Sequence, residues 1–400
     1  MNVPKLRFKN AEGADFPLWT ISKLGNEVQF SKGGKLGKSD LQKEGSHQCL
    51  LYGELYTSYG SIASKIFSRT DTDSDTTSQK YDVVMPTSGE TAEDIATATC
   101  IPFDGILYGG DLIILRSQTL YGPFLSYQIN SSLKRKISRV AQGKSVVHIG
   151  AEKIKPISFS FPCLEEQQKI ASFFSTLDQK IELNERKLEA LEKLKKGVMQ
   201  KIFKRAIRFK KNGEDFPKWN KVKIQETGEI RTGTTPKNNQ EGVYGGPHYW
   251  VTPTDIKSKE IYQTNKTLTD SGLQSGRVIP ANSVLVTCIA SIGKNAILRR
   301  KGSCNQQINA ITPNQNFNVD FVYYAITHAE PILHRLAGQG GMEIINKRDF
   351  SEVELFVPCL EEQNAIAAFL SSLDRKIQIS SERINNLNSL KQGFMQQMFV

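Results

Sequence analysis

Polar, basic and aromatic side chains gather in the predicted turns of two stretches of this sequence, residues 18–161 and 218–357. Arg, Lys, Asn and Gln side chains can hydrogen-bond to base edges, and turns rich in Gly, Ser and Thr suit contacts with phosphate. Together these residue types could recognise nucleic acid, although each one taken singly is also typical of an ordinary surface turn. The candidates in the first stretch are Lys32, Lys35, Lys38, Tyr56, Tyr59, Lys65, Gln142, Lys144 and Ser145. The candidates in the second stretch are Arg231, Thr234, Thr235, Lys237, Tyr249, Trp250, Thr254, Asp255, Ser291, Lys294, Asn305, Gln306, Gln307 and Gln339.

Two segments resemble motifs of phosphate or metal binding, but neither has the residues of that motif at the required spacing. Residues 33–39 resemble a phosphate-binding P-loop but lack the four residues that it needs between its glycines. Residues 71–75 resemble a calcium loop but lack its glycine and its closing glutamate. The six cysteines form no C-x-x-C pair, so we expect reduced thiols in or near the cores. The sequence therefore predicts a chain that is not an enzyme and holds no metal. A nuclease or methyltransferase with unrecognised motifs is the alternative.

The chain is basic and has no apolar segment of membrane-spanning length. Its 400 residues include 52 Lys and Arg against 41 Asp and Glu, which gives a formal net charge of +11. Basic proteins often bind nucleic acid, because neutralised phosphates release their counterions. No stretch approaches the roughly 18 apolar residues of a membrane span, and the N-terminus lacks the apolar core of a signal peptide. We therefore expect a cytoplasmic protein of two or three domains.

The elements that would position the candidate residues occur twice. Residues 162–203 align without a gap with residues 358–399 at an offset of 196 residues, and 21 of the 42 positions are identical. A shorter repeat, an R-F-K segment followed by D-F-P-x-W, precedes each stretch of candidates. The stretches in between resemble each other much less. This contrast indicates a constant scaffold that presents two different binding bodies, with ordinary drift after duplication as the alternative.

Each copy of the repeat predicts one helix of nearly 40 residues. Pro162 and Pro358 suit a helix entry a few residues later, and the glutamates that follow favour the positive end of the helix dipole. Apolar residues then recur every three to four positions, as in a coiled-coil seam. A lone helix cannot bury such a stripe, so we expect the two copies to pair, antiparallel and related by pseudo-twofold symmetry. Pairing between two chains is the alternative. The seam residues are Ile170, Phe174, Leu177, Ile181, Leu188, Leu191, Val198 and Ile202 in the first copy and Ile366, Leu370, Leu373, Ile377, Ile384, Leu387, Phe394 and Met398 in the second.

The two bodies are predicted to be mixed α/β (α+β), with their elements in a similar order. In the first body we expect strands over 21–30, 48–52, 81–85 and 111–116 and a helix over 126–137. In the second body we expect strands over 248–252, 283–289, 296–298 and 308–311 and a helix over 321–336.

Three motifs occur in both copies of the repeat: P-x-L-E-E-Q-x-x-I-A at the helix start, L-D-x-K-I within it and L-K-x-G-x-M-Q at its end. With segments 51–56, 228–236, 250–256 and 345–350 of the bodies, these motifs make the chain resemble the specificity (S) subunits of type I restriction–modification systems along nearly its whole length. The resemblance implies two target-recognition domains separated by two long helices that form an antiparallel coiled coil. The implied boundaries are 1–17 for an N-terminal conserved segment, 18–161 for target-recognition domain 1, 162–206 for the central conserved helix, 207–357 for target-recognition domain 2 and 358–400 for the C-terminal conserved helix.

The same resemblance implies a function and partners. Each recognition domain would bind one half of a bipartite, asymmetric site in double-stranded DNA. The helices would set the spacing and dock two methyltransferase (M) subunits, through which restriction (R) subunits join. AdoMet would bind on M, and ATP and Mg on R, with no cofactor on this chain. A coiled-coil scaffold with no DNA role is a further alternative.

Overall fold

The computed structural model of the chain describes residues 3–143, 146–236, 242–337 and 343–400. The chain divides into two compact units, a first unit of Met1–Glu185 with Ser381–Val400 and a second unit of Arg186–Ser380. Two long helices contribute to both units, α7 (Leu164–Phe203) and α12 (Leu360–Met398). The prediction of one long helix from each copy of the repeat is therefore confirmed.

The first unit is built on β-sheets that are covered by short helices. Its strands are β1 (Thr20–Lys23), β2 (Gln29–Lys32), β3 (His47–Leu50), β4 (Ser68–Thr70), β5 (Asp82–Pro86), β6 (Ser88–Gly89), β7 (Thr99–Ile101), β8 (Leu107–Tyr108), β9 (Leu112–Arg116), β10 (Val147–His148) and β11 (Ser158–Phe161). Its short helices are α1 (Leu24–Glu27), a 3-10 turn (Lys38–Asp40), α2 (Glu54–Thr57), α3 (Ala92–Ile95), α4 (Gly122–Gln128), a π segment (Ile129–Leu133), α5 (Lys134–Ser138) and α6 (Ala151–Ile154). A four-stranded antiparallel sheet has the order β2-β9-β5-β7, and a smaller sheet has the order β4-β3-β8.

The second unit is built in the same way. Its strands are β12 (Lys210–Lys211), β13 (Glu214–Asp215), β14 (Asn220–Lys223), β15 (Gly228–Thr232), β16 (Tyr244–Val251), β17 (Lys266–Leu268), β18 (Ser283–Thr287), β19 (Asn295–Leu298), β20 (Gly302–Cys304), β21 (Ile308–Pro313) and β22 (Glu354–Val357). Its short helices are α8 (Ile224–Thr227), a 3-10 turn (Pro253–Asp255), α9 (Asp270–Ser275), α10 (Val319–Leu336) and α11 (Lys347–Ser351). Its four-stranded sheet has the order β15-β21-β18-β19, and its smaller sheet has the order β17-β16-β20.

The two units therefore share one topology. The strand orders correspond one to one, and in both small sheets the central strand has one antiparallel and one parallel neighbour. A further two-stranded pair, β1-β11 in the first unit and β14-β22 in the second, also corresponds. The predicted repeat and the similar order of elements are confirmed, although the sequences of the two bodies differ widely.

Side chains of the central strand alternate between two apolar cores. Val83 and Met85 of β5 pack with Phe124 of the helical layer, whereas Val84 packs with Tyr108 of the smaller sheet. Successive side chains of a strand point to opposite faces, so both faces of β5 are covered. This double burial explains why β5 and its counterpart β18 are apolar over most of their length instead of alternating with polar residues.

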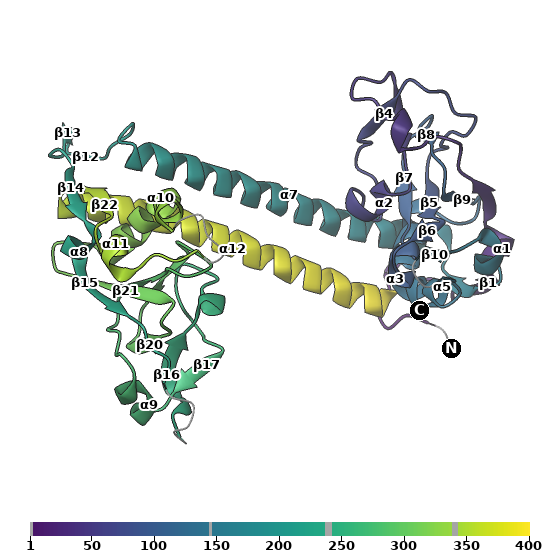
Figure 1. The fold of residues 1–400 in the computed structure, drawn as a ribbon. Coiled ribbons are helices and arrows are strands. Elements are labelled where there is room, and N and C mark those ends of the chain that lie inside the picture. The colour runs from purple at the N-terminus through teal and green to yellow at the C-terminus, as the bar shows by residue number, and fades with distance from the viewer. Residues whose placement is uncertain (1–2, 144–145, 237–241, 338–342) are drawn as a thin grey trace. The chain divides into compact units, whose positions relative to one another are not determined.

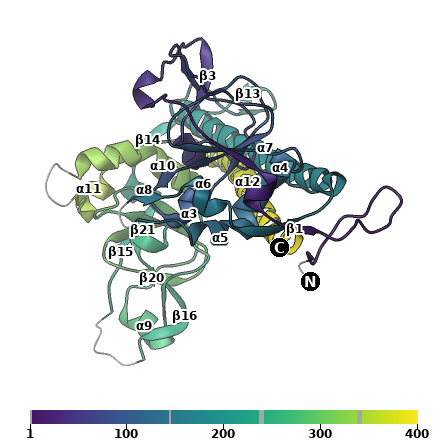
Figure 2. The ribbon, with the colours of Figure 1, turned by 90° about the vertical axis from the view of Figure 1, so that its right-hand side faces the viewer.

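The two long helices run antiparallel within each unit (Figure 1). In the first unit, Phe174 near the start of α7 stacks on Phe399 just beyond the end of α12, with ring centroids 5.6 Å apart. In the second unit, Phe203 at the end of α7 lies in one core with Ile366 near the start of α12. Figure 2 shows both chain ends in the first unit, where the Leu6 N–H donates to the Gln397 carbonyl at 3.1 Å. The predicted antiparallel pairing within one chain is confirmed.

The predicted seam residues differ in burial along the helices. The buried ones are Ile170, Phe174, Leu177, Ile181, Ile202, Ile366, Leu370, Leu373, Ile384 and Met398. The partly exposed ones are Leu188, Leu191, Val198, Ile377, Leu387 and Phe394. Burial is deepest where a helix segment packs against both its partner helix and the sheet-bearing part of its own unit.

The predicted single strand over 21–30 is wrong. The chain forms β1, turns through α1 and continues as β2, and the two strands belong to different sheets. The turn is held by backbone bonds, since the Leu24 N–H donates to Ile157 and the Gly25 N–H to Lys155. The predicted helix over 126–137 is found, but it begins at Gly122 and contains the π segment. The other expected elements overlap observed ones.

The cysteines follow the expectation with one exception. Four are buried, Cys359 is partly exposed and Cys163 is exposed, so the placement in or near a core is wrong for Cys163. Among the helices of the described ranges, none combines the length and the apolar character that crossing a membrane takes.

A buried carboxylate joins the start of each long helix to the segment that precedes the body. Glu166, whose side chain is fully buried, accepts hydrogen bonds from Nε and Nη2 of Arg7 at 3.0 and 2.7 Å. Its counterpart Glu362 accepts from Arg208 at 3.2 and 2.6 Å, and also from Nε1 of Trp219 at 3.0 Å. Each arginine also donates to the proline carbonyl of the F-P-x-W segment, Pro17 or Pro217, at 2.7 Å. These shared contacts explain why the arginine, the F-P-x-W segment and the E-E-Q motif are repeated together.

The glutamine that follows each buried glutamate fixes a helix of the body. Gln167 accepts from the backbone N–H of Tyr121, which precedes α4, at 2.8 Å, and Gln363 accepts from that of Asn318, which precedes α10, at 3.0 Å. Each glutamine also donates to the proline carbonyl five residues before it. The start of each long helix is thereby tied to the helical layer of its unit.

Replacing Glu362 by Gln is expected to destabilise the second unit. The substitution leaves the Arg208 charge without its carboxylate, and removing one partner of a buried pair costs about 3–5 kcal/mol. The measurement is the free energy of unfolding in urea.

The matched control is Glu361→Gln, because Glu361 is exposed and pairs with Lys211 at the surface, where a pair contributes roughly 0–1 kcal/mol. Fluorescence of Trp219 and Trp250 in a Trp19→Phe background reports the second unit. Equal destabilisation by the two substitutions would contradict the role given to the buried carboxylate.

Candidate nucleic-acid interface

Three candidate lysines lie exposed along one edge of the first unit. Lys32 ends β2, the edge strand of the four-stranded sheet, and Lys35 and Lys38 lie in the loop that follows. Lys38 lines a hollow of about 490 Å³ together with Tyr52 and Asp111. Three ammonium groups on one loop can contact successive phosphates of a nucleic-acid backbone.

The two candidate tyrosines of the first unit are held by the fold. The Tyr56 hydroxyl donates to the Ser88 carbonyl at 2.5 Å. The Tyr59 hydroxyl accepts from the backbone N–H of Phe67 at 3.1 Å, and burial raises the pKa of Tyr59 to about 12. Both rings therefore support loops, and their hydroxyls are already engaged.

Lys65 lies over an aromatic ring that sequence reasoning missed. Its Nζ is 4.5 Å from the centroid of the Phe67 ring, and 51% of Phe67 is exposed. A phenylalanine in a sequence is normally assigned to a core, so the residue type of Phe67 did not indicate a place in the interface. The adjacent candidates Tyr59 and Lys65 were the available indication.

Gln142, a further candidate of the first unit, lies beside a short strand. Gln142 is exposed and exchanges two backbone hydrogen bonds with His148 of β10, at 3.0 and 2.7 Å. Four candidates lie outside the described residues: Lys144, Ser145, Lys237 and Gln339.

In the second unit, the β15 strand and the loop after it carry three candidates in different environments. Arg231 forms two 2.7 Å hydrogen bonds with Glu229 and a third with the Val278 carbonyl. The Thr234 hydroxyl accepts from the backbone of Arg277 at 3.0 Å, and the Thr235 hydroxyl donates to a side chain of the neighbouring loop, 305–307. In this arrangement Arg231 is paired within the protein, while Thr235 is exposed.

The neighbouring loop brings further candidates to the same surface. Gln306 is the exposed partner of Thr235, whereas Asn305 is buried and donates from its amide to Gln307 at 2.8 Å. Trp250 is buried and donates from Nε1 to the Thr234 carbonyl at 3.1 Å. The buried Trp250 thus packs under the loop that contains Thr234, and Gln306 is exposed at the surface beside that loop.

Of the candidates around the β16–β17 connection, some are hydrogen-bonded within the protein and one is exposed. The Asp255 carboxylate accepts from Thr252 and from the Asn265 N–H, which fixes a turn. Thr254 is exposed. The Tyr249 hydroxyl donates to the Tyr262 carbonyl at 2.6 Å.

The turn between β18 and β19 carries the last two described candidates. The Ser291 carbonyl accepts from the Thr287 hydroxyl, and Lys294 is exposed after the tight turn at Gly293, where φ is +79°.

Sequence reasoning missed two exposed arginines near these candidates. Arg277 donates to the Thr232 carbonyl at 2.8 Å, and Arg300 lies 5.7 Å from the centroid of the Tyr249 ring. Both follow or precede short elements that the sequence did not reveal, so their proximity to the candidates was not visible.

Both units join the body to the two long helices through the same trio of side chains. In the first unit the Tyr127 hydroxyl donates to Asp178 of α7 at 2.7 Å, and Lys391 of α12 pairs with that carboxylate at 2.6 Å. In the second unit the Tyr324 hydroxyl donates to Asp374 of α12, and Lys195 of α7 pairs with it at 2.5 Å. The aspartates are related by the repeat offset of 196 residues, and so are the lysines.

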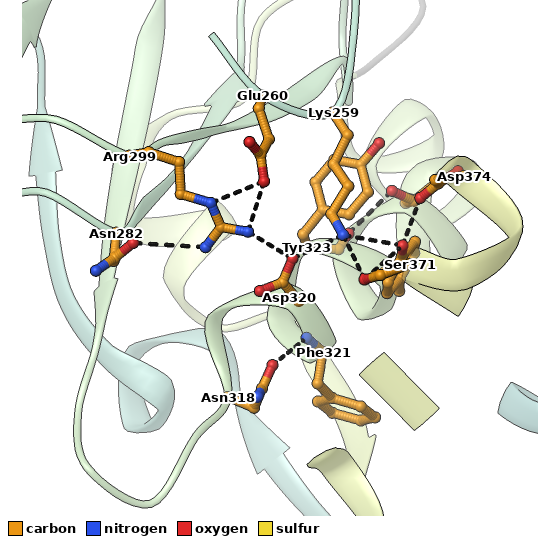
Figure 3. Close-up of polar contacts among 12 residues, drawn as sticks. Lys259, Glu260, Asn282, Arg299, Asn318, Asp320, Phe321, Tyr323, Ser371 and Asp374 are labelled. Atoms are coloured by element: carbon orange, nitrogen blue, oxygen red, sulfur yellow. Dashed lines mark hydrogen bonds and ion pairs between the residues drawn. The ribbon is translucent and has the colours of Figure 1, made fainter. Parts of the chain in front are cut away.

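A polar network extends this joint in the second unit (Figure 3). Lys259 Nζ donates to Ser371 of α12 at 2.7 Å and pairs with Asp320 of α10 at 2.7 Å. Arg299 of the loop after β19 bridges Glu260 and Asp320, each at 2.7 Å. Burial acts to raise the pKa of Asp320, but the hydrogen bonds from Lys259 and Arg299 outweigh it and lower the pKa below its ordinary value of 3.8.

In the described part of the chain, no group of three or more His, Cys, Asp or Glu side chains could hold a metal ion.

Acidification is expected to weaken the second unit through Asp320. A lowered folded-state pKa stabilises the fold above the ordinary value, and this contribution disappears as pH falls from about 4 through the folded pKa. The difference in unfolding free energy between wild type and Asp320→Asn should therefore be largest near pH 6 and shrink toward pH 3. Urea unfolding across this range measures it, and a difference that does not change with pH would contradict the assignment.

The comparisons with known proteins agree on one family. The family model described as type I restriction modification DNA specificity domain matches residues 18–193 and again residues 217–389. The type I restriction enzyme MjaVIII specificity subunit of Methanocaldococcus jannaschii is 25% identical over 419 residues, covering 97% of this chain and 94% of the relative. The putative MjaX specificity subunit of the same organism is 26% identical over 312 residues, covering 72% and 70%.

A solved structure has the same fold. The type I restriction–modification S subunit from M. genitalium matches with a TM-score of 0.67 at 16% sequence identity, covering 100% of this chain and 99% of that one. Because the domain model matches twice and spans most of the sequence, the chain belongs to the family of type I restriction–modification DNA specificity subunits and carries the family's domain in two copies.

Proposed function

We propose that this chain is the DNA-reading, non-catalytic subunit of a type I restriction–modification complex, with each unit binding one half of a bipartite, asymmetric site in double-stranded DNA. One observation carries the proposal: two units of identical topology expose different side chains at their loops. The first unit offers Lys32, Lys35 and Lys38, and the second offers Thr235 and Gln306. Two units that share one topology but expose different side chains at their loops suit a DNA site whose two halves differ in sequence.

The proposed division of labour follows the predicted boundaries. Residues 18–161 and 207–357 would be the recognition domains, preceded by the segment 1–17 and followed by the helical regions 162–206 and 358–400. Exposed lysines would contact phosphates, and exposed amides and hydroxyls would contact base edges. Tyr56, Tyr59, Arg231, Trp250 and Asp255 would act by holding these loops in place, since their polar groups are engaged within the protein.

The proposed partners follow from the repeat of the long helix. Because three motifs recur in both long helices, the helices would dock two copies of one partner, the methyltransferase subunit, and the restriction subunits would join through that complex. AdoMet would be bound by the methyltransferase subunits, and ATP and Mg by the restriction subunits. A complex that acts on chromosomal DNA works where that DNA lies, so we place the chain in the cytoplasm.

Exchanging one body should change one half of the recognised sequence. We expect a chimaera, in which residues 18–161 are replaced by the corresponding body of another specificity subunit, to keep one half of the methylated site and change the other. Sequencing of methylated adenines in cells that also carry the methyltransferase subunit measures this.

The matched control replaces residues 218–357 and should change the opposite half. A chimaera that changes both halves, or neither, would contradict the proposal. Methylation or cleavage of DNA by the purified chain alone, with AdoMet and Mg²⁺, would favour an enzyme. DNA binding that is absent even with the methyltransferase subunit, or that does not weaken as salt rises, would favour a scaffold without a DNA role.

A further inference from the structure

Phe67 is an apolar ring held out into solvent at the edge of the small sheet of the first unit. It lies in the connection between β3 and β4, one residue before β4 begins, and 51% of it is exposed. Single exposed apolar residues are common on protein surfaces, so exposure alone indicates nothing. Its surroundings distinguish it.

Three contacts fix the Phe67 ring in its exposed position. The ring of Tyr59 packs against it with centroids 5.4 Å apart, and the Tyr59 hydroxyl binds the Phe67 N–H at 3.1 Å. Tyr59 itself packs on the core that contains Leu55 and Ile66. Lys65 places its ammonium 4.5 Å from the centre of the Phe67 ring. The result is a supported aromatic surface with a positive charge beside it.

The corresponding connection of the second unit, between β16 and β17, also carries an exposed aromatic ring, although its surroundings differ. Tyr262 is 65% exposed there, and its carbonyl accepts a hydrogen bond from the inner tyrosine, Tyr249. Arg300 lies over the Tyr249 ring at 5.7 Å. Each unit thus presents an exposed aromatic ring whose backbone is bonded to the hydroxyl of an inner tyrosine. The cation lies over the outer ring, Phe67, in the first unit and over the inner ring, Tyr249, in the second, where the Tyr262 hydroxyl donates to Glu260 at 3.2 Å.

We propose that Phe67 and Tyr262 stack on DNA bases, one in each half of the recognised site, with Lys65 and Arg300 near the adjacent phosphates. This inference rests on the proposed function and deepens it. Exposed aromatic rings bind bases because every base has a flat π face, and apolar wedges inserted at base steps kink duplex DNA. The ammonium of Lys65 beside the Phe67 ring favours a polyanion as the occupant over an apolar protein surface.

The test uses the complete complex with methyltransferase subunits and a duplex that carries its recognised site. Binding is measured by fluorescence anisotropy at fixed salt, and stacking by 2-aminopurine placed at single positions in either half. We expect Phe67→Ala to weaken binding about 5- to 100-fold, the range of losses when one stacking ring is removed. We also expect it to abolish the 2-aminopurine response in the half assigned to the first unit by the body exchange.

Matched variants separate stacking from general effects. Tyr262→Ala should act on the opposite half, and Phe67→Trp should restore both affinity and response. Leu18→Ala removes a side chain that is 70% exposed in the same unit and should change neither.

Three outcomes of these measurements would overturn the stacking proposal. Wild-type affinity and an unchanged 2-aminopurine response in Phe67→Ala would overturn the inference while leaving the proposed function intact. Failure of the wild-type complex to bind its site would overturn both. A Phe67→Ala chain that no longer assembles with the methyltransferase subunit, with Phe67→Trp restoring assembly, would show a protein contact instead of base stacking.

Discussion

The fold depends on the contact between α7 and α12, two helices that lie about 200 residues apart in the chain and pack antiparallel. Apolar seam residues supply most of the stabilising free energy, since their burial removes large apolar areas from water. The ion pairs Asp178–Lys391 and Lys195–Asp374 specify how the two helices are aligned along each other. Their side chains are 21–31% exposed, so each contributes little energy by itself. A shift of one helix along the other would separate both pairs and the tyrosines bonded to them, and the pairs therefore select the register.

Several residues that are identical in the two copies also make identical contacts. Glu166 and Glu362 both accept from an arginine of the preceding segment, and Gln167 and Gln363 both hold the start of a body helix. These contacts lie where helix and body meet.

Much of this architecture could be predicted from the sequence because it follows from periodicity and repetition. The seam, the helix starts and the order of the strands were visible for that reason. The turn at Leu24 was not visible, because it depends on backbone bonds to Ile157 and Lys155 more than 100 residues away. Burial of Trp250 and the hydrogen bond from Arg231 to the Val278 carbonyl also arise from tertiary contacts, which residue type alone does not reveal.

The individual site residues were the hardest to assign. A basic or amide side chain in a turn looks the same whether it is paired within the protein, as Arg231 is, or exposed, as Lys35 is. An exposed phenylalanine such as Phe67 looks like a core residue. Packing separates these cases, and packing is set by residues distant in sequence.

Cross-linking of Asp178→Cys with Lys391→Cys tests the helix pairing most directly. Cys163 and Cys359 are first replaced by serine, and isotopically light and heavy chains are mixed before a short bis-maleimide is added. We expect the linked peptide in monomeric chains, with light joined to light and heavy to heavy. A control pair at positions 178 and 195, roughly 25 Å apart along α7, should not link. Absence of the 178–391 link from monomers, with light joined to heavy among the linked dimers, would contradict an antiparallel pair within one chain.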